Sequence, residues 1–248
     1  AERIGIVGES GSGKSMTARA ILGLVRQPGL VRADHLSFEG LDLMHQTAHS
    51  WLRVRGRRIG MILQDPKFSL NPVLRVGVQI AETALLHGVF AKREARKRVL
   101  EMLETVGVDK PERVFDAYPH QLSGGIGQRV MIAAMMIAEP QLIIADEPTS
   151  ALDVMVRGQV LAMMDREIRK RGMGLLMISH DLNMVANFCD RVLVMYQGRV
   201  VDRCAAKDLF ASQHPYTRGL LNCLPTGALH GHKLPTIDRL QLAQAQIA

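Results

Sequence analysis

The sequence lacks any run of uncharged apolar residues long enough to cross a bilayer. A membrane-spanning helix needs roughly 20 such residues, whereas apolar runs such as those at positions 174–178 and 192–196 have the length of single strands. No internal repeat or low-complexity tract is present either. We therefore expect a globular chain and any membrane role to be peripheral.

Cysteine and aromatic residues are scarce, and each scarcity argues against a class of site. The three cysteines, Cys189, Cys204 and Cys223, are widely spaced and odd in number, which gives no metal-ligand pattern and fits a reducing compartment. Phe, Trp and Tyr make up only 4% of the residues. A surface that stacks nucleic-acid bases is therefore poorly supported.

Positive charge is in excess, with a net charge of +7 and two basic clusters at positions 53–58 and 92–98. Such clusters can contact nucleic acid, anionic lipid or an acidic protein. Glu94 and Glu101 interleave with the second cluster at helical spacing, which favours a solvated helix face there. Because neither cluster contains an aromatic residue, we do not expect nucleic acid as a partner.

Short apolar segments alternate with segments of helical periodicity. We expect strands at 4–7, 58–63, 142–145 and 174–178. Helices are expected at about 126–138, 154–170 and 182–188. A hairpin is expected where residues 192–196 and 199–202 flank Gln197 and Gly198. The alternation predicts an α/β fold with a mainly parallel sheet covered by helices on both faces.

Residues 8–15, with the sequence GESGSGKS, match the phosphate-binding loop pattern in full. The glycines allow successive backbone N–H groups to converge on phosphate oxygens, and the start of the following helix adds positive potential. Lys14 is expected to reach the β- and γ-phosphates of a nucleotide, and the Ser15 hydroxyl is expected to bind Mg²⁺. A plain glycine-rich turn is the alternative, and the complete match between a strand and a helix argues against it.

Two acidic residues, Asp146 and Glu147, end the apolar strand expected at 142–145. Strands often end in Asp, but downstream of a phosphate-binding loop such a pair fits phosphoryl transfer. Asp146 is placed to hold Mg²⁺ through water, and Glu147 is placed to polarise the attacking water.

A second predicted anion site lies at Ser123, Gly124 and Gly125, before the helix expected from Ile126. Ser123 is suited to cap that helix, which is the structural alternative. The two glycines leave backbone N–H groups exposed for an anion. Because the chain has one phosphate-binding loop, this second site makes sense if it faces the nucleotide of another subunit.

Over nearly its whole length the chain resembles the nucleotide-binding domain of an ABC transporter. The resemblance rests on the order and spacing of the phosphate-binding loop, Gln64, residues 122–125, the two acids, residues 150–153 and His180. It implies that Gln64 senses the γ-phosphate and Mg²⁺, that Asp153 lies at a dimer contact and that His180 hydrogen-bonds the γ-phosphate. On its own, His180 would more often be a structural turn residue.

Finer features are similar to the oligopeptide, dipeptide and nickel importers of that family. They lie at residues 64–72, 118–121 and 214–221, and residues 55–59 resemble the first of the two unlike ATPases that such importers pair. For the segment that begins at His214, a helix-capping turn is the structural alternative. Gly127 departs from this branch, which tends to carry a basic residue there.

The resemblance implies a P-loop ATPase core within residues 1–225, an inserted helical lobe at about 70–141 and a weakly structured tail at 226–248. The strands that precede the phosphate-binding loop in the family, with an aromatic residue that stacks on adenine, are expected to be missing from the sequence. Two subunits would close head to tail over two ATP molecules, each site combining one chain's loop with the other chain's residues 123–125.

The implied function is to bind and hydrolyse ATP as a subunit of an ABC importer that takes up peptides or related small solutes. The implied partners are a second, related ATPase, two transmembrane permease subunits and, indirectly, a solute-binding protein. The chain would lie at the cytoplasmic face of a bacterial inner membrane. The alternative is a soluble ABC ATPase acting on nucleic acid or ribosomes, but such proteins usually carry tandem ATPase units or long coiled-coil insertions, and neither is present.

The predicted site therefore contains residues of three kinds. The expected catalytic residues are Glu147, His180, Gln64 and Lys14. ATP is expected to bind Gly8, Glu9, Ser10, Gly11, Ser12, Gly13, Lys14, Ser15 and Met16, and, from the other subunit, Ser123, Gly124 and Gly125. Mg²⁺ is expected to bind Ser15, Gln64 and Asp146.

Overall fold

A computed structural model describes residues 1–63, 69–150 and 152–224. The described chain divides into two compact units, the first with residues 1–2 and 15–176 and the second with residues 3–14 and 177–224. Gln64 and the tail expected at 226–248 lie outside the described residues. Within the part that is described, no helix is long and apolar enough to cross a membrane.

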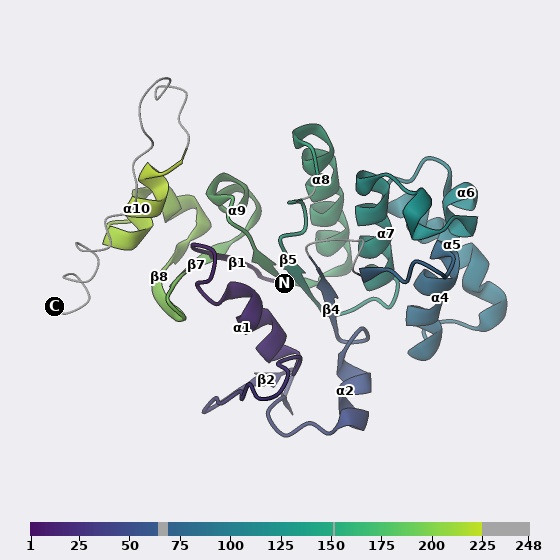
Figure 1. The fold of residues 1–248 in the computed structure, drawn as a ribbon, viewed down its shortest axis with the longest axis horizontal. Coiled ribbons are helices and arrows are strands. Elements are labelled where there is room, and N and C mark those ends of the chain that lie inside the picture. The colour runs from purple at the N-terminus through teal and green to yellow at the C-terminus, as the bar shows by residue number, and fades with distance from the viewer. Residues whose placement is uncertain (64–68, 151, 225–248) are drawn as a thin grey trace. The chain divides into compact units, whose positions relative to one another are not determined.

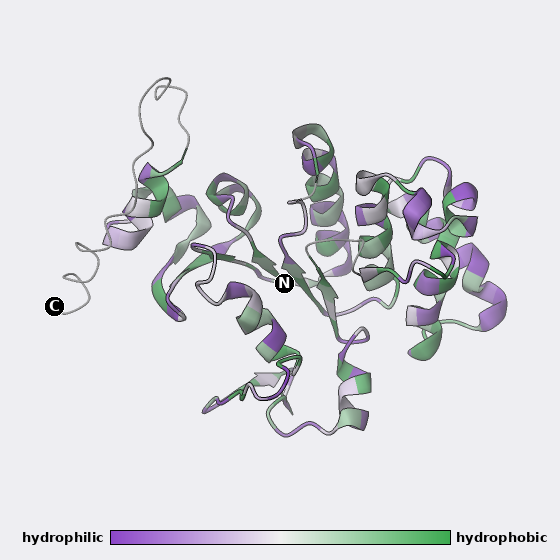
Figure 2. Ribbon diagram, viewed as in Figure 1, coloured by the Kyte–Doolittle hydropathy of each residue, from purple (hydrophilic) through white to green (hydrophobic). Residues whose placement is uncertain are grey.

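The first unit contains the parallel strands β4 (Ile59–Ile62) and β5 (Leu142–Asp146), with Ile59 opposite Leu142. Both strands are buried along most of their length and are apolar almost throughout, as parallel strands covered on both faces require. Figure 2 shows them in the green of hydrophobic residues. Strand β6 (Gly174–Ile178) follows β5 in the sheet, and its first three residues belong to this unit.

Between β4 and β5 the chain forms helices that pack against one another (Figure 1). They are α4 (Val76–Leu86), α5 (Ala95–Thr105), α6 (Pro111–Asp116) and α7 (Gly124–Met136), with 3-10 turns η1 (Lys92–Glu94) and η2 (Pro119–Gln121). Fully buried aliphatic side chains, among them Ile80, Leu103 and Val130, fill their interior. Helix α7 also packs against β4, which ties this helical group to the strands of the first unit.

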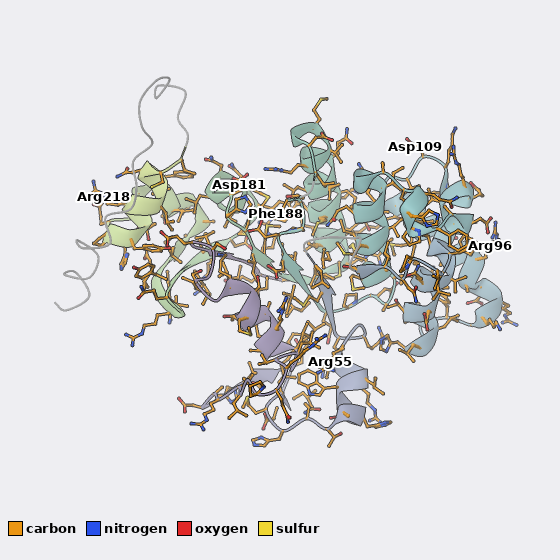
Figure 3. All side chains as sticks on the ribbon, viewed as in Figure 1. Arg55, Arg96, Asp109, Asp181, Phe188 and Arg218 are labelled. Atoms are coloured by element: carbon orange, nitrogen blue, oxygen red, sulfur yellow. The ribbon has the colours of Figure 1, made fainter. Side chains whose placement is uncertain are left out.

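The basic cluster at 92–98 lies on η1 and α5, as the periodicity predicts. Lys97 and Arg98 form ion pairs with Glu101 at 3.9 and 3.7 Å. Arg96, labelled in Figure 3, places its guanidinium 4.4 Å from the centroid of the Phe115 ring. Contacts within the helical group therefore occupy much of this charge, in agreement with a solvated helix face.

The other basic cluster, at 53–58, spans the end of helix α2 (Ala48–Val54), and its side chains are largely engaged in contacts within the first unit. Before α2 the chain forms α1 (Lys14–Ile21), β2 (Ser37–Phe38) and β3 (Leu41–Asp42). Arg55 lies over the buried Trp51 ring, 4.5 Å from its centroid, and donates to the carbonyls of Leu22 and Gly23 at 2.8 Å each. Arg57 donates to the carbonyl of Ala138 at 2.7 Å. These arginines therefore serve internal contacts.

Helix α8 (Val154–Arg171) begins at its cap Asp153, whose carboxylate accepts from the Val156 N–H at 2.9 Å. It ends at Gly172, which adopts the left-handed conformation (φ 62°) that glycine tolerates at a helix C-terminus. The cap explains locally why an aspartate occupies this position, in addition to the dimer contact that the family resemblance predicts.

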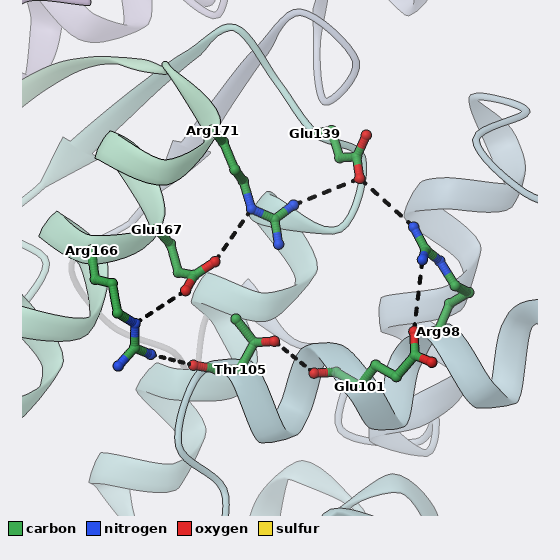
Figure 4. A network of polar contacts seen from close by, with 7 residues as sticks. All are labelled: Arg98, Glu101, Thr105, Glu139, Arg166, Glu167 and Arg171. Carbon is green, nitrogen blue, oxygen red and sulfur yellow. Dashed lines mark hydrogen bonds and ion pairs between the residues drawn. The ribbon is translucent and has the colours of Figure 1, made fainter.

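An ionic network connects the end of α8 with α5 (Figure 4). At its centre Glu167, only 3% exposed, accepts hydrogen bonds from Arg166 at 3.2 Å and Arg171 at 3.4 Å. Arg171 also forms an ion pair with Glu139 at 3.7 Å, and Arg98 of α5 forms an ion pair with Glu139 at the same distance. The buried carboxylate of Glu167 thus forms ion pairs with two arginines of α8.

We expect Glu167→Ala to lower the free energy of unfolding by about 1–3 kcal/mol, because Arg166 loses a charged partner and the partly solvated Arg171 keeps only its weaker ion pair with Glu139. The measurement is urea denaturation followed by circular dichroism. The matched control is Glu101→Ala, a half-exposed carboxylate of the same network, which should change stability by less than about 1 kcal/mol. Equal small losses in both variants would contradict the central position of Glu167.

The second unit is built on β1 (Arg3–Val7), which pairs in parallel with β7 (Arg191–Tyr196), and on β8 (Arg199–Ala205), which pairs with β7 in the antiparallel sense. The predicted hairpin is confirmed, with its turn at Gln197 and Gly198. Helix α9 (Leu182–Phe188) ends at the residue Phe188 labelled in Figure 3. The remaining elements are η3 (Ala206–Ala211) and α10 (Pro215–Asn222). With parallel pairs in both units, the predicted mainly parallel α/β sheet is confirmed.

Candidate functional site

The phosphate-binding loop connects β1 to α1, as predicted. Gly8 has φ 148°, and a Cβ atom there would overlap the carbonyl oxygen of Met195, so only glycine fits. Gly13 also has a positive φ, 101°. The Ser12 carbonyl accepts from the Gly198 N–H at 3.0 Å, which joins the loop to the turn between β7 and β8. The turn between β7 and β8 therefore helps to hold the phosphate-binding loop in place within the second unit.

The Lys14 side chain folds back onto the loop and is only 8% exposed. Its ammonium donates to the carbonyl oxygens of Gly8 and Glu9 at 2.8 Å each and approaches Ser12 Oγ at 3.4 Å. A cation held against the concave backbone of a phosphate-binding loop is positioned for the charge of a phosphate.

In the first unit, Ser15 Oγ donates to Asp146 Oδ1 at 2.9 Å, although 131 residues separate the two. Asp146 ends β5 and is 6% exposed. A hydroxyl and a carboxylate oxygen are the hard ligands that Mg²⁺ prefers, so this pair fits the predicted metal role. Elsewhere among the described residues, no cluster of three or more His, Cys, Asp or Glu side chains could hold a metal ion.

Glu147 follows β5 in a left-handed backbone conformation, with φ 51°. Its carbonyl oxygen accepts from the Ser150 N–H at 3.3 Å and from Ser150 Oγ at 3.1 Å. Gln128 of α7, almost fully buried, donates its side-chain amide to the Pro148 carbonyl. A non-glycine residue held in this sparsely populated conformation by its surroundings is typical of a functional site. Gln128 was not among the predicted residues, although a glutamine in a largely apolar helix was an available signal.

Ser123 caps α7, with its Oγ accepting from the Ile126 N–H at 3.5 Å. The structural alternative for this residue is therefore confirmed, and its anion-binding role stays a prediction. Ser123 and Gly124 are exposed, whereas a Cβ at Gly125 would lie 3.1 Å from Val156 Cγ1. Ser123 and Gly125 also line a hollow of about 940 Å³ in the first unit. The start of α7 is therefore accessible at the surface of the first unit.

His180 is exposed and lies between β6 and α9. The preceding residue, Ser179, donates its N–H to the Ile6 carbonyl at 3.1 Å, two residues before Gly8. Asp181 caps α9 by accepting from the Met184 N–H at 2.9 Å. His180 therefore lies between the end of β6 and the capped start of α9.

The predicted residues fall into two groups, one in each unit. The second unit holds residues 8–14 and His180, and the first unit holds residues 15–16, 123–125, Asp146 and Glu147. Lys14 and Ser15 are consecutive in the chain and connect the groups covalently. Met16 is half-exposed, and Gln64 lies outside the described residues.

The ABC transporter family matches residues 1–150 of the chain. The chain is 47% identical over 238 residues to a dipeptide transport ATP-binding protein of Haemophilus influenzae, covering 96% of this chain and 72% of that protein. It is 46% identical over 227 residues to an oligopeptide transport ATP-binding protein of Bacillus subtilis, covering 91% of this chain and 63% of that protein.

Solved structures show the same likeness at lower identity. A dimeric ATP-binding cassette in a post-hydrolysis state, bound to ADP and phosphate, matches with a TM-score of 0.70 at 29% identity, over 83% of this chain and 85% of that one. A component of an ABC transporter complex from Clostridium perfringens matches with a TM-score of 0.72 at 27% identity, over 86% and 80%. The chain therefore belongs to the ABC transporter family, as one of its ATP-binding subunits.

Proposed function

We propose that this chain holds ATP in its phosphate-binding loop and hydrolyses it with Glu147 as the base, powering uptake of peptides or related small solutes through partner membrane subunits. ATP hydrolysis coupled to transport is the activity of its family. The names of the dipeptide and oligopeptide transport relatives support peptides as the solute class. The observation that carries the proposal is a hydrogen bond to the buried Asp146 from Ser15, the residue that directly follows Lys14.

In this proposal each residue acts on one part of the nucleotide. Lys14 moves its ammonium from the loop carbonyls to the β- and γ-phosphates. When bound, Mg²⁺ neutralises charge on the phosphate oxygens, and Ser15 and Asp146 are the residues that would hold it. Glu147 orients the attacking water and accepts its proton, and His180 donates a hydrogen bond to the γ-phosphate. Gln64 is proposed to sense the γ-phosphate and Mg²⁺.

The other half of each site is proposed to come from a second ATPase. Ser123 and Gly124 are exposed at the start of α7, where backbone N–H groups and the helix dipole favour an anion. The similar solved cassette bound to ADP and phosphate is described as a dimer, which supports this arrangement. Two chains arranged head to tail would each supply residues 123–125 to the nucleotide of the other, with Asp153 at their contact.

The proposed place of work is the cytoplasmic face of a bacterial inner membrane, where two permease subunits bind the ATPase pair. A solute-binding protein outside the membrane would select the solute. The alternative function on nucleic acid or ribosomes is not favoured, because the relatives are named for transport. Copurification with hydrophobic membrane subunits rather than with nucleic acid is the expected result.

The second ATPase is proposed to be related but not identical, because residues 55–59 resemble the first of two unlike subunits. We expect little ATP-driven transport in proteoliposomes that contain the membrane subunits, the solute-binding protein and this chain alone, and full transport once the second ATPase is added. The control is the same preparation with the second ATPase alone. Equal transport with this chain alone and with both ATPases would contradict the unlike pair.

A further inference from the structure

We propose that Tyr216 positions the phosphate-binding loop, and that the segment 214–217 is a brace for the nucleotide site. The inference rests on the proposed role of that loop in binding ATP. It gives a function to a segment for which the sequence suggested only a helix-capping turn. All of the residues involved belong to the second unit.

The central contact is a hydrogen bond from the backbone N–H of Glu9 to the hydroxyl oxygen of Tyr216, at 3.1 Å. Tyr216 is 1% exposed, so its oxygen meets the loop inside the protein. Its ring packs on the Tyr196 ring with the centroids 4.4 Å apart. Since Tyr196 ends β7, the tyrosine is held between the sheet and the loop.

The hydroxyl keeps one charge state under physiological conditions. Burial raises the pKa of Tyr216 to about 12, so the phenol remains neutral at pH 7. A neutral hydroxyl oxygen accepts from the Glu9 N–H without bringing negative charge to a loop that must bind phosphate.

Glu9 is fixed at both ends of its backbone. Its N–H is held by Tyr216, while its carbonyl oxygen accepts from the Lys14 ammonium at 2.8 Å and from the Ser12 N–H at 3.2 Å. A shift of the tyrosine would therefore move the same residue that positions Lys14. Preorganised N–H groups bind phosphate without an ordering cost, so a loosened loop should bind ATP more weakly.

Helix α10 is itself anchored, which allows Tyr216 to act as a rigid support. Thr217, fully buried, donates to Asp202 Oδ2 at 2.7 Å, and Ser212 donates to the same oxygen at 2.6 Å. Burial raises the pKa of Asp202, but the hydrogen bonds from the two hydroxyls outweigh it and leave the pKa below its usual value. His214 caps α10 by accepting from the Tyr216 N–H at 3.2 Å, so the capping-turn interpretation is confirmed.

The test is Tyr216→Phe in the full subunit, which keeps the ring and removes the acceptor. One hydrogen bond of ordinary net strength corresponds to a loss of between about two- and tenfold in ATP affinity, measured by isothermal titration. In the assembled transporter, KM for ATP should rise by a similar factor while kcat changes less than about twofold. Hydrogen exchange of the Glu9 amide should accelerate in the variant without nucleotide.

The matched control is Tyr196→Phe, which also removes one tyrosine hydroxyl from the pair of contacting rings. That hydroxyl accepts from the Gln197 side chain at 3.3 Å and not from the loop. The control should keep the wild-type ATP affinity and the slow exchange at Glu9, and both variants should have similar melting temperatures.

The outcomes separate this inference from the proposed function. Wild-type affinity and unchanged Glu9 exchange in Tyr216→Phe, with a clear loss of affinity in Lys14→Ala, would overturn the brace and leave the ATP site intact. Equal losses in both tyrosine variants would also overturn it, because they would indicate a general effect of the aromatic pair. If Lys14→Ala caused no loss of affinity, the proposed ATP site itself would fail, while Glu9 exchange would still report on the Tyr216 contact.

Discussion

Replacing Glu147 with Gln is expected to lower ATP turnover by roughly 10²–10⁴-fold, because the carboxylate that accepts the proton of the attacking water is lost. ATP binding should persist, since the phosphate contacts of residues 8–15 are unchanged. Glutamine keeps the size of the side chain, so the left-handed backbone at this position (φ 51°) is no harder to form. Phosphate release from the assembled transporter measures turnover, and isothermal titration of the subunit measures binding.

Glu139→Gln is the matched control, because Glu139 is also a glutamate with a positive φ, 54°, and lies in the connection between α7 and β5. Its side chain is half-exposed in the ionic network of α8, away from the residues assigned to the nucleotide. The control should hydrolyse ATP within about twofold of the wild type. Turnover preserved in Glu147→Gln would remove this residue from its role as base.

Lys14→Ala is expected to act on binding itself. The ammonium makes charge-assisted contacts, each worth about 1.5–3 kcal/mol, so loss of its contacts with the phosphates should weaken ATP affinity by roughly ten- to 150-fold. The loop also loses the hydrogen bonds that the ammonium donates to the carbonyls of Gly8 and Glu9. Isothermal titration gives the dissociation constant directly.

Lys170→Ala is the control for the loss of a positive charge, because Lys170 is exposed on α8. Its ATP affinity should equal that of the wild type. If Lys14→Ala bound ATP as tightly as this control, the phosphate contact assigned to Lys14 would be wrong, whatever the effect on turnover.

Local patterns in the sequence were sufficient for most of the elements. The bounds of α9 and β6 were predicted residue for residue. The hairpin of β7 and β8 followed from the Gln197-Gly198 turn. Ser123 was predicted as a helix cap and is one in the structure, whereas Asp153, expected only at a dimer contact, is found to be an N-cap as well.

Contacts between distant parts of the chain could not be predicted from local sequence patterns. The bond from Glu9 to Tyr216 spans 207 residues and depends on how α10 packs, which no spacing along the chain reports. The left-handed backbone of Glu147 has no glycine to indicate it. Arg55 was part of a basic cluster in the sequence, and only the fold shows that it packs on Trp51 and binds backbone carbonyls. Ser15 and Asp146 were both predicted to bind Mg²⁺ from the chemistry of phosphate sites, and the hydrogen bond between them could not be predicted from periodicity.

The most direct measurement of the central claim is the mass of the Glu147→Gln subunit, mixed with its paired ATPase, by light scattering with and without ATP. The account predicts one ATP-dependent dimer, because each nucleotide is enclosed by the loop of one chain and residues 123–125 of the other. Adding Gly124→Asp should abolish this dimer, since a Cβ there meets open space and the fold is kept, while the new carboxylate repels the partner's nucleotide. A dimer that forms without ATP, or that survives Gly124→Asp, would contradict the shared site.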